Sequence, residues 1–293
     1  MYKKLCFILM IISIGSLTNI SAQNNNELNS RRKVLKWDFN WQWNSDSRPM
    51  IEVNYGLGEP KHSNFESSFS KVGLAELKIG YSSLDDYYRS PLLELEEKYF
   101  YASNISTELK SEDNDLSKLD SDLWRFGVGI RSGYGYNAGS VAIIPYIQYS
   151  LDWSKLNMKE FPDTTMQSDV ETLNKYNNSF RFGTSSEGGI KIEFASFLAL
   201  NASYETSVIF PRHLFWRHLG SVIVELMGYT TIDYFVDEII DSSPAAGPIL
   251  NFLLKAGYSY AFYHLKKDKM NWPFASESPL TFEIAKVGVT FAF

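Results

Sequence analysis

One short string in this chain of 293 residues, His62-Ser63-Asn64, contains residue types that could perform nucleophilic catalysis. On a strand, a histidine can activate a serine hydroxyl when one residue separates them, because that spacing puts both side chains on one face. His62 and Ser63 are adjacent, so on a strand they would face opposite ways, and they lie between Pro60 and Phe69 in an expected loop. The spacing argues against an enzyme, and no catalytic residues are assigned.

The other three histidines, His213, His218 and His264, fall in the C-terminal third of the chain. On a helix, two histidines converge on one metal at i, i+4 spacing, whereas His218 is the fifth residue after His213. An acid-rich stretch, residues 108–122, lacks the glycine and the regularly spaced ligands of a calcium-binding loop. We therefore expect no metal site and no cofactor.

Residues 1–22 have the features of a signal peptide. Two lysines precede an uncharged apolar run over residues 5–17, and Ser21-Ala22 supply small residues before a polar stretch. The run is too short to span a bilayer as a helix, which favours a cleaved signal over an uncleaved anchor. The single cysteine, Cys6, lies within the run, so the exported chain is expected to contain neither a thiol nor a disulfide.

Composition excludes several classes of protein. Loss of Lys3 and Lys4 with the signal would change the formal net charge from −6 to about −8. A mildly acidic chain whose only basic cluster is Arg31-Arg32-Lys33 is not expected to bind nucleic acid. After the signal there is no stretch of about 18 uncharged apolar residues, so we expect no membrane-spanning helix.

The rest of the chain is dominated by alternation of apolar and polar residues with a period of two. One example is residues 124–130, with the sequence WRFGVGI. Alternation places the two sets of side chains on opposite faces of a sheet. Several runs reach about 12–16 residues, longer than the ~5–6 usual in soluble proteins and long enough for a tilted membrane strand, which needs ~9–11.

The two faces of these runs differ in composition. The apolar set carries Tyr, Trp and Phe near strand ends, as do the aromatic girdles of lipid-facing surfaces. The other set is rich in glycine and charge, and we expect it to point into a closed lumen. Its acids are predicted to be Glu52, Glu76, Glu94, Glu96, Asp152, Glu187, Glu193 and Glu205, and its bases Lys78, Lys98, Arg125, Arg131, Arg181, Lys191 and Lys286.

The last run carries the most specific signal. Val287, Val289, Phe291 and Phe293 alternate with polar or small residues up to the C-terminus. This ending resembles the bacterial outer-membrane β-barrel superfamily, in which a terminal Phe is part of the assembly signal. The resemblance implies a location in the bacterial outer membrane, with the lipid bilayer as one partner and the outer-membrane assembly machinery, through Phe293, as another. It identifies no specific family.

The expected fold class is all-β, an antiparallel transmembrane β-barrel of eight strands with an α-helical insert before the last strand. The predicted strands are 49–58, 70–82, 92–104, 121–133, 139–153, 178–194, 197–210 and 279–293. Their connections alternate between shorter and longer ones, which places both termini in the periplasm. Residues 34–43 could form a further strand, and alternation over 252–262 would then give ten strands, the alternative count. The expected organisation is a signal peptide at 1–22, an N-terminal segment at 23–48, and a barrel over 49–293 with an insert at about 211–278.

The insert has a different periodicity. Over 212–241, apolar residues recur at three- and four-residue spacing, which predicts an amphipathic helix that ends before Pro244. Residues 248–267 fit either a helix or a strand. The two segments could form a hairpin that covers one barrel mouth, or they could form a plug, a lid or a docking surface.

Three functions are compatible with these patterns. The preferred one is a non-enzymatic outer-membrane barrel whose loops and insert bind a partner or the cell envelope. Eight strands leave a lumen that side chains can fill, and the inward acids and bases nearly balance. A passive channel or transporter would need ten or more strands, or an unplugged lumen. A membrane lipid hydrolase would depend on His62 and is the least favoured.

Overall fold

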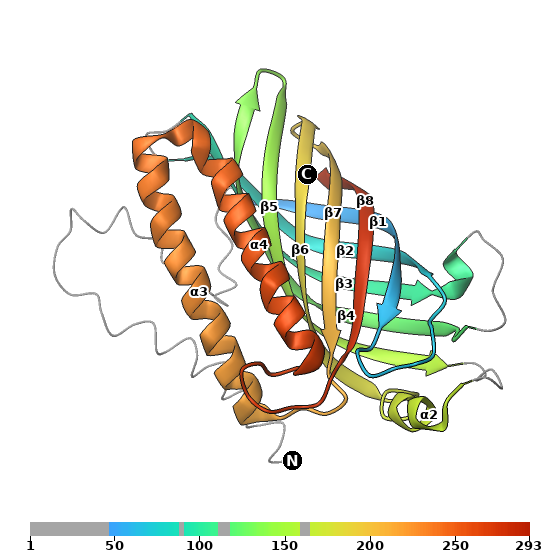
Figure 1. Cartoon of the computed structure of the whole chain (residues 1–293). Helices are drawn as coiled ribbons and strands as arrows, with labels where there is room; N and C mark the ends of the chain where they lie inside the picture. Colours follow the sequence, from blue (N-terminus) through green and yellow to red (C-terminus); the bar gives the residue numbers. More distant parts are fainter. Residues whose placement is uncertain (1–46, 88–90, 111–117, 159–164) are drawn as a thin grey trace, which may run out of the picture. The chain divides into compact units, whose positions relative to one another are not determined.

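The computed structural model describes residues 47–87, 91–110, 118–158 and 165–293. Eight antiparallel strands form a closed barrel, in which consecutive strands pair and β8 pairs with β1 (Figure 1). The strands are β1 (Arg48–Lys61), β2 (Val72–Asp86), β3 (Leu92–Ser106), β4 (Ser121–Ala138), β5 (Val141–Met158), β6 (Phe180–Ala195), β7 (Leu198–Ile209) and β8 (Leu280–Ala292). The prediction of an eight-stranded barrel is confirmed. The predicted signal peptide and the strand proposed at 34–43 lie outside the described residues.

The connections alternate in length around the barrel, as the sequence predicts. The start of β1 and the end of β8 lie at one end, with Met50 opposite Ala292, and the β2–β3, β4–β5 and β6–β7 turns lie at the same end. The β4–β5 turn contains Gly139 at a φ of 78°, a conformation that glycine adopts without a steric penalty. The longer connections lie at the opposite end and include η2 (Thr107–Leu109) and α2 (Gln167–Leu173).

The insert between β7 and β8 is a helical hairpin of α3 (Phe215–Ser242) and α4 (Gly247–Asp268), with η3 (Pro244–Ala246) between them. The helix predicted over 212–241 is confirmed. The ambiguous segment is also a helix, so the extra strand at 252–262 was wrong. Its buried positions include Asn251, Lys255 and Ser259, a helical spacing that the alternation of aromatic residues obscured. No described helix has both the length and the apolar character needed to cross a membrane.

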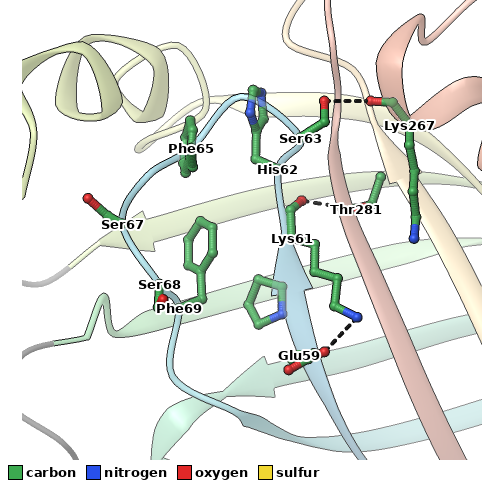
Figure 2. Close-up of a pocket in the computed structure, with 11 residues that line it drawn as sticks. Glu59, Lys61, His62, Ser63, Phe65, Ser67, Ser68, Phe69, Lys267 and Thr281 are labelled. Carbon is green, nitrogen blue, oxygen red and sulfur yellow. Dashed lines mark hydrogen bonds and ion pairs between the residues drawn. The ribbon is translucent and has the colours of Figure 1, made fainter.

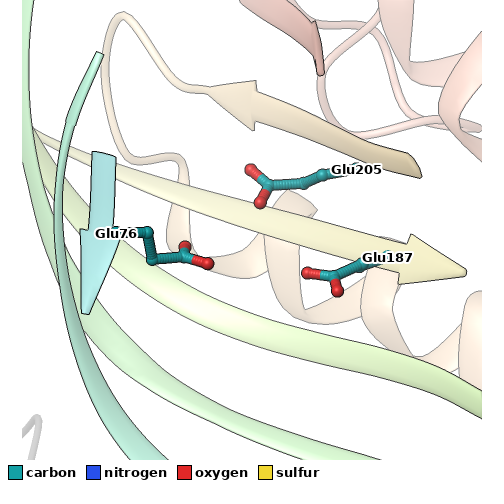
Figure 3. A group of neighbouring side chains, drawn as sticks. All are labelled: Glu76, Glu187 and Glu205. Atoms are coloured by element: carbon teal, nitrogen blue, oxygen red, sulfur yellow. The ribbon is translucent and has the colours of Figure 1, made fainter. Parts of the chain in front are cut away.

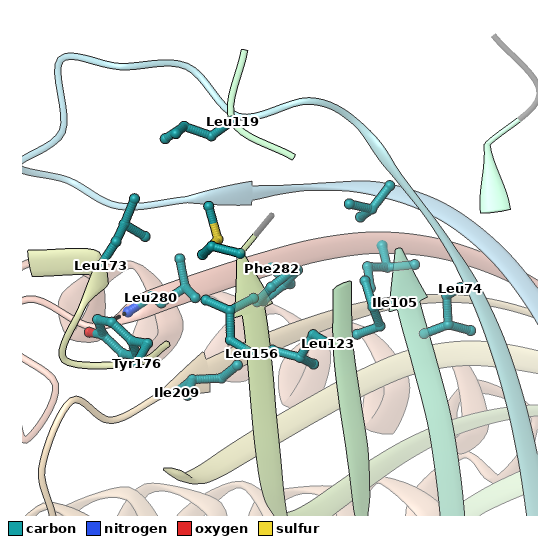
Figure 4. Packing of buried hydrophobic residues seen from close by; sticks show 13 residues of the cluster. Leu74, Ile105, Leu119, Leu123, Leu156, Leu173, Tyr176, Ile209, Leu280 and Phe282 are labelled. Carbon is teal, nitrogen blue, oxygen red and sulfur yellow. Dashed lines mark hydrogen bonds between the residues drawn. The ribbon is translucent and has the colours of Figure 1, made fainter. Parts of the chain in front are cut away.

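Inward-facing residues near the long-loop end of the barrel form an apolar cluster, which we call the apolar plug (Figure 4). α2 and the segment after η2 contribute buried side chains to it from outside the strands. Its members are Val72, Leu74, Ile105, Leu119, Leu123, Leu156, Met158, Leu173, Tyr176, Ile209, Leu280, Phe282 and Ile284. Phe65 and Phe69 pack against it from the β1–β2 connection. This end of the lumen is therefore packed with hydrocarbon.

Beyond the plug, many of the inward-facing side chains are polar or charged and buried, and we call this region the charged lumen. Its buried charges are Glu52, Glu76, Lys78, Glu97, Arg125, Arg131, Asp152, Glu187, Lys191, Glu205 and Lys286. Most of them were predicted to face inward.

One strand is the exception. On β3 the predicted inward residues Glu94, Glu96 and Lys98 lie on the outer face, and Glu97 is inside. The prediction was wrong because it took the apolar and aromatic residues of β3 for the lipid-facing set, whereas Tyr99 and neighbouring large side chains fill the lumen.

The outer face of the barrel is apolar and exposed. Its exposed large side chains on the strands include Ile51, Val53, Tyr55, Leu57, Leu77, Ile79, Phe100, Trp124, Phe126, Ile190, Leu200, Tyr204, Val287 and Phe291. A soluble barrel buries apolar residues inside and shows polar ones to water, so this molecule has the reverse arrangement over most of its wall.

Candidate functional site

The catalytic-looking string lies beside a pocket of about 410 Å³ at the long-loop end of the barrel (Figure 2). His62 follows the last residue of β1, and its ring stacks on Phe65 with centroids 4.2 Å apart. Phe65 stacks in turn on Phe69, at 5.6 Å. Ser63 Oγ donates a hydrogen bond to the Lys267 carbonyl, 3.1 Å away. The Ser63 hydroxyl is therefore directed at the end of α4 and does not donate to the His62 imidazole.

The surroundings of His62 favour its neutral form. Burial lowers the pKa of the imidazole below its usual value. The backbone N–H of Asn64 donates to its Nδ1 at 3.3 Å, which leaves Nε2 as the protonated nitrogen of the neutral ring. Asp169 of α2 accepts hydrogen bonds from the backbone N–H groups of Glu66 and Ser67, at 3.2 and 2.9 Å. The carboxylate thus ties the loop to α2 and does not orient the imidazole.

Two of the histidines in the insert come together, although their sequence spacing did not predict it. The rings of His213 and His218 lie 5.2 Å apart, because His213 precedes α3 and is free of helical geometry. Both rings also contact Phe182 of β6. Within the described ranges, neither histidine belongs to a group of three side chains placed to ligate one metal. The pair is part of an aromatic cluster.

The charged lumen contains a continuous network of ion pairs and hydrogen bonds. Arg131 forms a two-pronged contact with Glu52, with Nη–Oε distances of 2.7 and 2.8 Å, and reaches Glu97 at 2.8 Å. Lys191 pairs with Glu97 from the far wall, and Lys78 pairs with Glu52 at 3.2 Å. Charges that are shielded from water need such partners, because an unpaired buried charge is costly.

Three carboxylates, those of Glu76, Glu187 and Glu205, have oxygens within 4.8 Å of one another (Figure 3). This is a geometry that could hold a metal ion. The Lys286 ammonium already lies among them, at 3.1 Å from Glu76 and 2.6 Å from each of the other two. Arg125 adds a second cation, 2.5 Å from Glu205. The position that a metal ion would take is therefore filled by a side chain.

Aromatic side chains complete the filling of the lumen. The Arg131 guanidinium lies over the ring of Tyr146 at 4.3 Å, and Lys78 lies over Tyr99 at 5.0 Å. The Tyr146 hydroxyl donates to Glu187 at 2.9 Å. Such cation–π contacts strengthen where water is excluded. The sequence analysis did not single out these tyrosines as lumen residues, since a tyrosine at a lipid interface and one in a lumen look the same in the sequence.

No family model and no curated protein matches the sequence. Among solved structures, Neisserial surface protein A is similar over 84% of this chain and 97% of its own, at 10% sequence identity and a TM-score of 0.38. The Yersinia pestis attachment invasion locus protein Ail, solved with the heparin analogue sucrose octasulfate, is similar over 84% of this chain and 99% of its own, at 8% identity and a TM-score of 0.31.

Proposed function

We propose that this chain is a non-enzymatic bacterial outer-membrane β-barrel with a closed lumen, which serves to hold its long-loop end at the cell surface. The observation that carries the proposal is the reversal of its faces. Many of the charged side chains on the strands are buried inside, and most of the large exposed side chains of the wall are apolar. Only a surrounding hydrocarbon phase makes that arrangement favourable.

The closed lumen distinguishes this function from that of a channel. Water would have to pass the apolar plug at one end and then displace ion pairs such as Arg131–Glu52 and Lys286–Glu187. Because eight strands enclose a space that side chains can fill, no aqueous path is required by the fold. The long loops and the pocket beside His62 lie at the plugged end, and this end is where we expect contact with the cell envelope or a surface partner.

The predicted signal peptide and the terminal Phe293 support export and assembly as parts of the same proposal. Phe293 is exposed, and its backbone N–H donates to the Pro49 carbonyl at 2.9 Å. Its side chain is therefore accessible to assembly machinery. The lipid-hydrolase alternative gains no support, since the Ser63 hydroxyl donates its hydrogen bond to a backbone carbonyl and not to His62.

Two measurements test the proposal. The purified chain should need detergent or lipid to fold, and a folded monomer in plain buffer would overturn the membrane location. Reconstituted in planar bilayers, the protein should carry no steady current at low voltage, with a general porin as the positive control. A steady single-channel conductance would overturn the closed lumen and leave the channel function.

A further inference from the structure

The α3–α4 hairpin lies along the outer wall of the barrel, and not over a mouth or in the lumen, which were two of the positions that the sequence left open (Figure 1). α4 contacts β4, β5, β6 and β7. Ile147 lies at an outward position of β5 and is nevertheless only 2% exposed. A Cβ added at Gly188, an outward position of β6, would lie 3.5–3.6 Å from Phe252 and Ala256 of α4. These distances are ordinary van der Waals contacts, so α4 packs directly against the wall at Gly188.

The hairpin runs from one end of the barrel to the other. At the short-turn end, Tyr136 near the end of β4 donates a hydrogen bond to the carbonyl of Ala245, between the two helices. At the long-loop end, Phe182 and Phe210 of the barrel contact His218 in the first turn of α3. The helices therefore extend over the full height of the wall.

The faces of α4 are inverted relative to those of a helix on a soluble protein. Polar side chains are buried toward the barrel and α3, at Asn251, Lys255, Ser259 and Lys266. Large apolar side chains are exposed on the opposite face, at Ile249, Leu253, Tyr260 and Leu265. α3 likewise exposes Ile223, Met227, Tyr234 and Phe235. In water the stable arrangement would be the reverse.

The charges in the middle of the hairpin neutralise one another across the contact between the two helices, which we call the helix seam. Lys255 pairs with Asp233 at 2.5 Å, and Lys266 pairs with Glu225 at 2.6 Å. The exposed polar groups are also satisfied within the helix. The hydroxyls of Thr230 and Thr231 donate to the carbonyls of Leu226 and Met227, at 3.0 and 2.9 Å. This is a common way to satisfy a hydroxyl in an apolar medium.

Exposed charges on α3 are confined to its two ends. Between Arg217 and Glu238, the exposed positions of α3 are apolar or carry a hydroxyl. The rise between these two residues is about 31 Å at about 1.5 Å per residue, close to the ~30 Å thickness of the hydrocarbon layer of a bilayer. The uncharged surface thus matches the layer in height.

An aromatic row connects the barrel wall to the base of the hairpin. Its members are Phe126, Trp153, Phe182, His213, Phe215 and Trp216, and each ring centroid lies 4.9–6.3 Å from the next. Aromatic side chains gather where hydrocarbon meets the polar headgroups. The row therefore marks one common hydrocarbon–headgroup boundary for the barrel and the hairpin. The apolar surfaces of the two are continuous there.

We propose that the outer face of the α3–α4 hairpin contacts the acyl chains of the bilayer, so that two helices cover part of the strands β4–β7 and supply part of the lipid-facing surface on that side of the barrel. The inference rests on the proposed membrane location. Neither helix is both long and apolar enough to cross a bilayer by itself, and the barrel wall and the helix seam shield the charges that the helices carry. The hairpin is thus a lipid-facing shell that depends on the barrel.

Lipid contact can be measured with single cysteines in a Cys6→Ser background. The variants Leu253→Cys and Met227→Cys probe the hairpin, and their native side chains are 56% and 65% exposed. Val287→Cys on β8, with a native side chain 62% exposed, is the matched barrel control. Lys175→Cys, after α2, is the aqueous control. Each variant is labelled with bimane in phosphatidylcholine vesicles, and quenching is measured with doxyl-labelled lipid and with iodide.

We expect doxyl lipid to quench the hairpin labels to within about twofold of the Val287 label, and iodide to quench only the Lys175 label strongly. Iodide quenching at both hairpin positions would place the hairpin in water and overturn the inference. Insensitivity to both quenchers would place protein, such as a second copy, on this face and would also overturn it. Absence of lipid quenching at Val287 would instead overturn the membrane location itself. Ile223→Cys and Ile249→Cys replace any variant that does not fold.

Discussion

The two regions of the barrel interior, the apolar plug and the charged lumen, exclude water through different interactions. The apolar plug excludes water through side-chain packing, and each of its members contributes through the apolar surface it buries. The charged lumen excludes water through a network in which each charge needs its partners, as Arg131 needs Glu52 and Glu97. Removing one member of the plug should leave a cavity, whereas removing one member of the lumen should leave an uncompensated charge. The lumen should therefore be the more sensitive region.

The largest effect is expected for Lys286→Met. The change leaves the carboxylates of Glu76, Glu187 and Glu205 around an uncharged side chain, and removing one partner of a buried ion pair costs about 3–5 kcal/mol. The free energy of unfolding in urea, measured in detergent micelles or vesicles, should fall by that amount.

The control for this prediction is Lys98→Met, on the outer face of β3. Lys98 pairs with Glu96 at 3.1 Å, and that pair is partly exposed, so its loss should cost less than about 1 kcal/mol. Equal losses for Lys286→Met and Lys98→Met would mean that the lumen is hydrated enough to screen its charges, and the contrast with the plug would be lost.

A smaller loss is expected for Leu173→Ala in the plug. Leu173 of α2 is fully buried, and truncation of a buried leucine costs about 2–4 kcal/mol when the site relaxes only partly. The same urea titration measures the loss. Met166→Ala, at the exposed start of α2, should change stability by less than about 0.5 kcal/mol. A null result for Leu173→Ala would show that α2 is not packed on the barrel.

The helix seam extends the comparison, since it also buries charge but gives each charge a single partner. Lys255→Met leaves the carboxylate of Asp233 without its lysine, and we expect a loss of about 1–2 kcal/mol because only one carboxylate loses its partner and its side chain is 17% exposed. The double change Lys255→Met with Asp233→Asn should recover part of the loss in the same urea titration. If the free energy of unfolding lost by the double variant exceeds the sum of the losses of the two single variants, the Lys255–Asp233 pair does not stabilise the helix seam.

Sequence periodicity predicted the strands well, because few structures besides a strand show a period of two over a dozen residues. The ends of β1, β4 and β5 lie a few residues beyond their predicted limits. The helix α3 was predicted from its own spacing. These features are local, and local patterns carry enough information to identify them.

The face assignment of β3 and the position of the hairpin could not be predicted in the same way. Periodicity states which residues share a face, but not what covers that face. Tyr99 and Tyr101 could belong to a lipid girdle or to a lumen, and the cations Arg131 and Arg125 beneath their rings come from a neighbouring strand. The buried lysines of α4 likewise depend on Asp233 and Glu225 of α3, which no local pattern places opposite them.

The smallest expected effect concerns pH at the rim of the plug, where a titratable group rests on apolar ones. Burial lowers the pKa of His62 in the folded protein, so the unfolded chain binds a proton more readily there than the folded one does. The contribution of His62 to stability should be fully present above its unfolded pKa of about 6.5 and should be lost as the pH falls below that value.

His62→Gln, which does not titrate, isolates this contribution. When the pH is lowered from 7.5 to 5.5, the urea midpoint of the native chain should fall relative to that of the variant. The effects of all other titrating groups cancel, because both proteins contain them. The Hε1 resonance of His62 should titrate below the midpoint of about 6.5 seen for an unstructured histidine. If the urea midpoints of the two proteins change in parallel with pH, and the His62 resonance titrates at about 6.5, the imidazole is hydrated. The stack of His62 on Phe65 would then lie outside the packed rim of the plug.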